Sequence, residues 1–145
     1  MSIAVFNRQR KIRFDLRRVK QIANCALREE HVAETAAPGS AFSRLESIEV
    51  TIVSDGKIAA IHEQFMRIPG ATDVITFEHG EIVISAETAL KNAERFSQPV
   101  EHELALYIIH GLLHLRGYND QNPSDAARMR DLQERVLKKC LETIP

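Results

Sequence analysis

The segment from His110 to Asp120 reads HGLLHLRGYND and contains the residues best suited to chemistry. His110 and His114 are four positions apart, so on a helix their imidazole rings project from one face and can reach the same ion. Gly117 allows the chain to reverse, which brings the carboxylate of Asp120 toward that ion. Two imidazoles and one carboxylate leave the fourth position of a tetrahedral zinc ion to water. An open position is typical of catalytic rather than structural zinc sites.

Histidine pairs at this spacing also arise by chance, and most isolated pairs bind no metal. Here both rings lie in an apolar stretch, with Tyr-Ile-Ile before the first histidine and leucines around the second. A neutral imidazole in such surroundings needs a partner, which favours metal binding. In helical zinc proteases of the pattern His-Glu-x-x-His, the glutamate is the general base. Gly111 takes that position here, so peptide hydrolysis is disfavoured.

The elements that must position these side chains follow from the spacing of apolar residues. A helix is predicted over residues 100–116 and ends at Gly117, because glycine adopts the backbone conformation that closes a helix. A last helix is predicted to begin at residues 122–124, with Ser124 as its N-cap. Asp120 is therefore expected on the loop between the two helices.

Upstream of this region, predicted strands and helices alternate. Strands are predicted over residues 3–6, 47–53, 73–77 and 81–85, the last two forming a hairpin. Further helices are predicted after Asp15, over residues 56–66 and over residues 86–95, and residues 33–43 are predicted to be a loop. The order predicts an α+β fold: a single domain over residues 1–145, in which a small mixed sheet of about four strands packs with about five helices.

Composition excludes some classes of function. The chain has 145 residues, of which 44% are apolar, and its 19 Lys and Arg nearly balance 20 Asp and Glu. This balance argues against a protein that coats nucleic acid through its overall charge. No apolar run approaches the ~20 residues of a membrane span, and the N-terminus does not resemble a secretory signal, so a cytoplasmic protein is expected. Cys25 and Cys140 match no metal-ligand spacing and are predicted to be buried thiols.

The histidine segment resembles the YbeY family, bacterial endoribonucleases associated with ribosomal RNA maturation. The family pattern HGxLHLxGYDH is similar to HGLLHLRGYND, and Met129 lies at the distance where the family has methionine. Upstream, TDVITF from Thr72 is similar to the family's TDVLSF, and GEIVI from Gly80 to its GDIVI. The resemblance covers most of the chain from Ile48 onward. It implies a zinc-dependent endoribonuclease.

The chain departs from the family pattern at two places. The third metal ligand of the family is a histidine, whereas this chain has Asp120, preceded by Asn119. A carboxylate is a competent zinc ligand and an amide oxygen a poor one, so Asp120 is the predicted ligand and Asn119 the alternative. A family arginine precedes TDV by a few residues. Met66 is in register with it, and Arg67, one residue further, is the candidate for contacting the substrate phosphate.

A basic segment lies near the N-terminus and is opposed only by Asp15. It contains Arg8, Arg10, Lys11, Arg13, Arg17, Arg18 and Lys20. With an RNA substrate implied, this segment is predicted to bind RNA phosphates. The alternative is a strand and helix face that is merely solvated.

Together these features predict a zinc-dependent endoribonuclease in which His110, His114 and Asp120 hold one Zn²⁺. The predicted substrates are ribosomal RNA or its precursors, in maturation and ribosome quality control, and the predicted partners are the ribosome or ribosomal proteins. Neither DNA nor a membrane is expected as a partner. Two alternatives stay open. One is a non-catalytic ribosome-assembly factor with a structural metal, suggested by the missing general base and the altered third ligand. The other is a metal hydrolase of another substrate.

Overall fold

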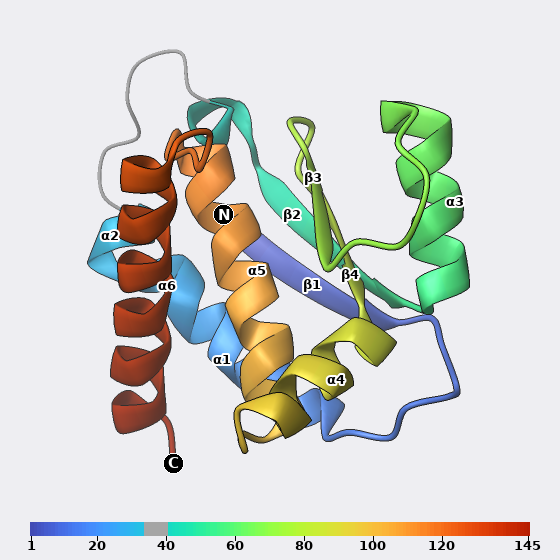
Figure 1. Ribbon diagram of the computed structural model, residues 1–145. Coiled ribbons are helices and arrows are strands. Elements are labelled where there is room, and N and C mark those ends of the chain that lie inside the picture. The colour runs from blue at the N-terminus through green and yellow to red at the C-terminus, as the bar shows by residue number, and fades with distance from the viewer. Residues whose placement is uncertain (34–40) are drawn as a thin grey trace.

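The computed structural model describes residues 1–33 and 41–145, and a four-stranded sheet lies at its centre (Figure 1). The strands are β1 (Ser2–Asn7), β2 (Ser47–Val53), β3 (Val74–Phe77) and β4 (Glu81–Ser85). Their order is β1-β2-β4-β3; the first three are parallel, and β3 runs antiparallel to β4 at the edge. The mixed sheet and the β3–β4 hairpin confirm the predicted α+β fold.

Helices surround this sheet, and most begin and end close to the predicted positions. They are α1 (Leu16–Arg28), α2 (Glu30–Ala33), α3 (Asp55–Met66), α4 (Ala86–Arg95), α5 (Val100–Arg116) and α6 (Pro123–Thr143), with a 3-10 turn η1 (Phe42–Arg44). The short α2 and η1 were not predicted, because three or four residues are too few to show a period. The loop predicted over residues 33–43 falls mostly outside the described residues. Among the helices described, none is long and apolar enough to cross a membrane.

The helices cover the sheet unequally. Helices α1 and α5 pack on one face, with α6 outside them, whereas α3 covers the other face (Figure 1). Alternation along the strands explains both contacts: Ile82 and Ile84 of β4 join the main core, and Val83 joins a smaller cluster with Ile58 of α3. A strand buried on both sides is apolar at successive positions, as β4 is.

Helix α5 approaches β4 very closely at Gly111. A β-carbon added there would lie 2.7 Å from Cδ1 of Ile82, which is closer than packed carbon atoms come. The missing side chain therefore allows the central helix to lie against the sheet.

Local capping sets where the helices begin and end. Asp15 caps α1 as predicted, accepting a hydrogen bond from the backbone N–H of Arg18 at 3.2 Å. Gly117 ends α5 with φ at 117°. The prediction of Ser124 as the cap of α6 is wrong. Asn122 is the N-cap, because its side chain accepts a bond from the N–H of Asp125 at 2.8 Å and a proline follows it at the first helical position.

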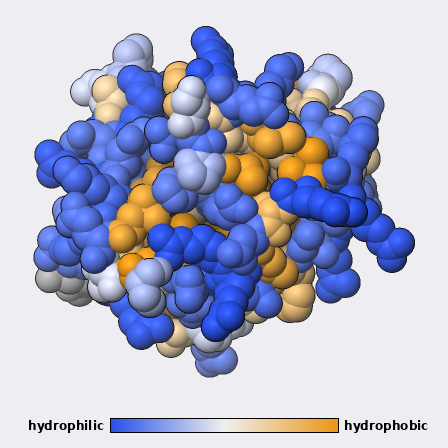
Figure 2. Space-filling model, turned by 90° about the horizontal axis from the view of Figure 1, so that it is seen from below, coloured by the Kyte–Doolittle hydropathy of each residue, from blue (hydrophilic) through white to orange (hydrophobic). Residues whose placement is uncertain are grey.

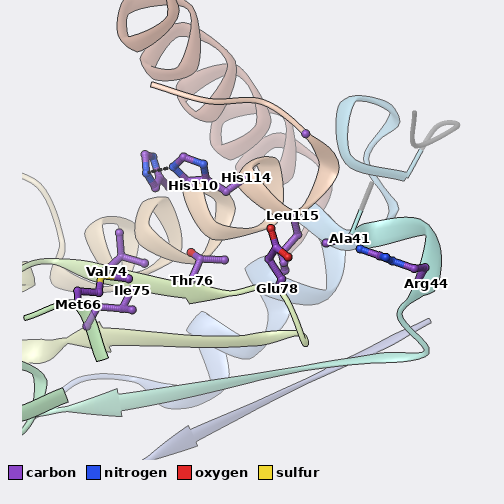
Figure 3. Close-up of a pocket in the computed structure, with 11 residues that line it drawn as sticks. Ala41, Arg44, Met66, Val74, Ile75, Thr76, Glu78, His110, His114 and Leu115 are labelled. Atoms are coloured by element: carbon purple, nitrogen blue, oxygen red, sulfur yellow. Dashed lines mark hydrogen bonds between the residues drawn. The ribbon is translucent and has the colours of Figure 1, made fainter. Parts of the chain in front are cut away.

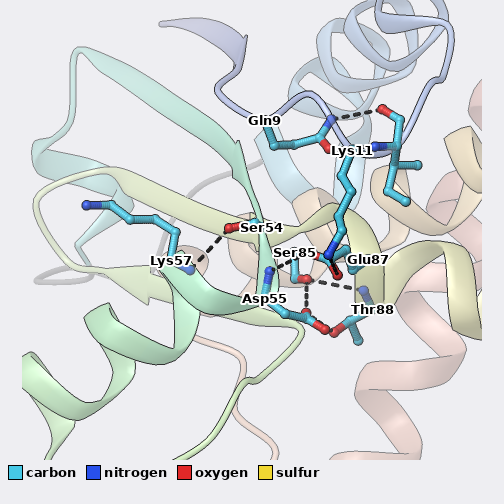
Figure 4. Close-up of polar contacts among 9 residues, drawn as sticks. Gln9, Lys11, Ser54, Asp55, Lys57, Ser85, Glu87 and Thr88 are labelled. Atoms are coloured by element: carbon cyan, nitrogen blue, oxygen red, sulfur yellow. Dashed lines mark hydrogen bonds and ion pairs between the residues drawn. The ribbon is translucent and has the colours of Figure 1, made fainter.

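A polar network joins α3 and α4 at the carboxyl ends of β2 and β4 (Figure 4). The carboxylate of Asp55 accepts hydrogen bonds from the hydroxyls of Ser85 and Thr88, the latter at 2.8 Å. Glu87 accepts a bond from the Asp55 N–H at 3.1 Å and pairs with the Lys11 ammonium at 3.4 Å. The network thus connects part of the basic segment to this end of the sheet.

Candidate metal centre

The structure brings the three predicted ligands together. His110 and His114 project from the last two turns of α5, and the chain reversal after Gly117 returns Asp120 to them. The Nε2 atoms of the two histidines lie 3.0 Å apart. The Asp120 carboxylate places Oδ2 3.6 Å from Nε2 of His110 and Oδ1 3.5 Å from Nε2 of His114.

These separations fit a tetrahedral zinc ion. With zinc–ligand bonds of about 2.0–2.2 Å, the ligand atoms of a tetrahedral site lie about 3.3–3.6 Å from one another. The two carboxylate separations, which involve different oxygens of Asp120, match the upper end of that range, and the 3.0 Å between the imidazole nitrogens is somewhat shorter. Because the three residues supply only three ligand atoms, the fourth position is left for water or substrate, as a catalytic site requires.

A residue that was not predicted orients the first histidine. The side-chain oxygen of Gln133, on α6, lies 3.0 Å from Nδ1 of His110. Because an amide oxygen only accepts hydrogen bonds, Nδ1 carries the proton and the Nε2 lone pair faces the other ligands. Gln133 lies one helical turn after Met129 in the sequence, but this spacing alone does not mark it as a partner of His110.

The electrostatic environment favours the metal-binding form of His114. Burial lowers the pKa of this imidazole below its ordinary value, and the neighbouring His110 adds to the effect, while Asp120 opposes it. The ring is therefore neutral near pH 7, as a metal ligand must be.

Asn119 takes no part in this group. Its side-chain oxygen accepts a hydrogen bond from the backbone N–H of Gln121 at 3.3 Å, within the loop. Of the two acidic or amide residues considered as third ligand, Asp120 is the one that lies with the histidines.

The histidine pair forms one wall of an open cavity of about 530 Å³ (Figure 3). The floor is the α5-facing side of β3, and Met66 and Arg44 lie toward opposite ends. The lining residues in the described part of the chain are Ala41, Arg44, Met66, Val74, Ile75, Thr76, Glu78, His110, His114, Leu115 and Gly117. Arg44 was not predicted, since nothing in its local sequence marks it.

The sequence is also similar to those of known proteins. The sequence pattern of the family described as Endoribonuclease YbeY matches residues 4–141. The chain belongs to the YbeY family. Proteins named Endoribonuclease YbeY include one from Syntrophus aciditrophicus, 32% identical over 94% of this chain and 88% of its own length. Another, from Phocaeicola vulgatus, is 37% identical over 70% of this chain and 75% of its own length.

The fold has also been seen in a solved structure. The solution structure of a protein from Thermotoga maritima superposes with a TM-score of 0.63 and covers 95% of this chain and 88% of its own. Its sequence is 23% identical, so this likeness concerns the fold alone.

The arginine of the YbeY pattern has no counterpart in the cavity at the expected place. Met66, in register with that arginine, lines the cavity. Arg67 ends α3 with a left-handed φ of 56° and is not among the lining residues of the described chain. A phosphate contact by Arg67 stays a prediction.

The basic segment lies at the opposite end of the sheet from the candidate metal centre. The cavity is lined by residues that precede β2 and β4, whereas the segment begins after the carboxyl end of β1, which is parallel to both. A strand of seven residues separates the two ends by about 20 Å. Figure 2 views the molecule from the end of the basic segment, and hydrophilic side chains cover most of it. RNA binding by the basic residues stays a prediction for Arg8, Arg10, Lys11, Arg13, Arg17 and Arg18. Arg18 also donates a hydrogen bond to the carbonyl oxygen of Pro145 at 2.7 Å.

A second group of possible ligands lies elsewhere and has a different character. Glu29, Glu30 and His31 gather at α2. The ammonium of Lys139 lies 3.5 Å from both glutamates, and His31 Nδ1 lies 3.0 Å from Glu29. The lysine of α6 thus pairs with both carboxylates, so these contacts by themselves account for the grouping of the acidic side chains.

Proposed function

We propose that this chain is a zinc-dependent endoribonuclease that hydrolyses phosphodiester bonds of ribosomal RNA or its precursors. Its role would be in ribosomal RNA maturation and ribosome quality control in the cytoplasm, in contact with the ribosome or its proteins. The observation that carries the proposal is the group of His110, His114 and Asp120, whose two histidines line an open cavity. Membership of the YbeY family, whose members are named endoribonucleases, supplies RNA as the substrate class.

The chain's own residues prepare the site for this chemistry. Zinc held there would lower the pKa of a bound water and offset negative charge on the scissile phosphate. Gln133 holds His110 in the tautomer whose Nε2 can bind, and burial keeps His114 neutral. Asp120 contributes the only negative charge of the three ligands and thereby strengthens cation binding. The cavity beside the histidines is open, so an extended strand of RNA can reach them.

The structure also explains why this site differs from that of a zinc protease. The position that holds the glutamate general base in those enzymes is Gly111, and any side chain there would meet Ile82 of the sheet. A glutamate there requires either the Ile82 side chain or α5 to shift. This packing argues against peptide hydrolysis as the alternative activity.

The first test removes one ligand. His114→Ala is expected to lose both bound zinc and zinc-dependent cleavage of ribosomal RNA, measured by elemental analysis and by a gel assay. His102→Ala is the matched control, because His102 lies on the same helix about 12 Å earlier along its axis. Cleavage by folded His114→Ala at the wild-type rate would refute the catalytic proposal.

A second test identifies the third ligand. Asp120→Ala is expected to weaken zinc binding strongly, whereas Asn119→Ala is expected to leave it within about twofold, since Asn119 bonds inside its own loop. The reverse order of effects would assign the ligand to Asn119.

The second candidate function is a ribosome-assembly factor that binds RNA or ribosomal protein around a structural metal. It is favoured by the absence of a side chain at Gly111, where a base would otherwise stand. Cells that lack the protein distinguish the two functions. If folded His114→Ala restores ribosome maturation in them, the binding function replaces the catalytic one.

A further inference from the structure

Apart from the two histidines, Arg44 is the basic side chain among the lining residues of the described chain. It lies on η1, shortly before β2, is exposed, and extends toward Ala41 at one end of the cavity (Figure 3). Within residues 1–33 and 41–145, no hydrogen bond or ion pair engages its guanidinium. An arginine in that state has all five N–H donors available to a ligand.

The opposite end of the cavity is apolar. Met66, Val74 and Ile75 lie together there, below the histidine pair (Figure 3). Met66 is 44% exposed, so its thioether is free to contact a ligand. The cavity is therefore polarised, with a cation toward one end, an apolar surface toward the other, and the candidate metal group between them.

We propose that Arg44 binds a backbone phosphate of the substrate and that the Met66 end of the cavity takes a nucleobase. The inference rests on the proposed function, since it concerns the same cavity. The two contacts together fix the position of the RNA strand across the metal group.

Charge and shape both support this assignment. A guanidinium binds phosphate through paired hydrogen bonds, which position a strand without reading its sequence. Glu78 also lines the cavity, and its carboxylate opposes phosphate binding there, but no ion pair joins it to Arg44, so the guanidinium keeps its charge. Apolar side chains at the other end can cover the face of any base.

The position of Arg44 also accounts for the missing family arginine. Met66 stands at the position of that residue and lines the cavity. Arg67 ends α3 in a left-handed backbone conformation. Arg44, on η1, supplies positive charge to the cavity in place of that arginine.

The experiment measures binding rather than cleavage, and it is carried out in a chelator so that the result is independent of zinc. A fluorescent single-stranded RNA of about five nucleotides is titrated against the full chain at several salt concentrations. Arg44→Ala is expected to weaken binding about tenfold and to lower the slope of log K against log salt by about 0.7, the value for one lost phosphate contact. The affinity of Arg44→Lys is expected to lie between those of the wild type and Arg44→Ala, because lysine keeps the positive charge but cannot form the paired hydrogen bonds.

Two comparisons make the result specific. Arg95→Ala, an exposed arginine on α4, removes the same charge and is expected to leave affinity and salt slope unchanged. Met66→Ser is expected to weaken binding of the RNA but not of an abasic ribose-phosphate oligomer of the same length, whereas Arg44→Ala weakens both.

The outcomes separate this inference from the proposed function. If Arg44→Ala binds with the affinity and slope of Arg95→Ala, the phosphate assignment fails, even where wild-type protein with zinc cleaves RNA. If Met66→Ser weakens both oligomers equally, the base assignment fails. If binding changes as expected but zinc-loaded wild-type protein cleaves no RNA, the cavity assignment holds and the nuclease function fails.

Discussion

Nδ1 of His110, on α5, lies 3.0 Å from the side-chain oxygen of Gln133, on α6. This contact holds a metal-ligand candidate in one orientation from a helix that supplies no ligand itself. Residues in such supporting positions commonly change metal affinity as much as some ligands do.

Replacing Gln133 is therefore expected to weaken zinc binding without abolishing it. Gln133→Ala should lower zinc affinity about 10–100-fold, because His110 loses the partner that sets its tautomer and ring orientation. Competition with a coloured zinc chelator measures the effect. Gln133→Glu restores an acceptor and should recover most of the affinity, while Gln98→Ala, an exposed glutamine, should have none of this effect. Wild-type affinity in Gln133→Ala would show that the contact is incidental.

The contact between α5 and β4 predicts an unusual response to alanine. Gly111→Ala is expected to destabilise the protein by about 1–3 kcal/mol, because the new methyl group meets Ile82, although alanine favours helix by about 1 kcal/mol. Gly56→Ala, in α3, is the matched control. The nearest atom to its added β-carbon is 4.0 Å away, so it should stabilise by about 0.5–1 kcal/mol.

Urea unfolding of the two glycine variants, compared with the wild type, checks both signs. Ile82→Val removes the nearest atom and should recover part of the loss in the double variant. Stabilisation by Gly111→Ala would mean that α5 and β4 are less tightly packed than described.

Glu103, on α5, predicts a dependence of stability on pH. Burial raises the pKa of its carboxyl above the ordinary 4.5, with Asp73 and Glu134 adding to the shift and a hydrogen bond with Tyr107 opposing it. The folded state therefore holds this proton to higher pH than the unfolded state does. The free energy of unfolding should fall as pH rises from about 4.5 through the raised value, and then level off.

Glu103→Gln should remove this pH-dependent part of the free energy of unfolding. Its stability relative to the wild type is expected to increase between about pH 4 and pH 7, as measured by urea unfolding at each pH. Glu94→Gln, at the surface of α4, controls for the general loss of one negative charge. A stability difference that does not change with pH would contradict the raised pKa.

The position of the basic segment predicts that its effect depends on RNA length. Arg10→Ala with Arg13→Ala should weaken binding of an RNA of about thirty nucleotides and lower its salt slope by about 1.4. It should affect an RNA of about five nucleotides much less, because the cavity is about 20 Å away along the sheet. Arg135→Ala with Lys138→Ala, on α6, is the matched pair of charge removals. Equal weakening of the short RNA would place the segment in contact with the cavity.

The sequence alone was sufficient to predict the order of the strands and the longer helices and to select the three candidate ligands, because these depend on local rules. Two histidines four residues apart share a helix face wherever that helix packs, and a glycine reverses the chain wherever it ends a helix. The alternation of apolar residues likewise identified the strands before their partners were known.

Only the tertiary structure decided which distant residues meet. Gln133 reaches His110 because α6 packs on α5, Arg44 lines the cavity because η1 precedes β2 at that end, and the basic segment lies at the other end because β1 and β2 are parallel. Such contacts depend on how whole elements pack together. No local spacing in the chain records that packing, so the supporting and substrate-facing residues could not be predicted from the sequence as the ligands were.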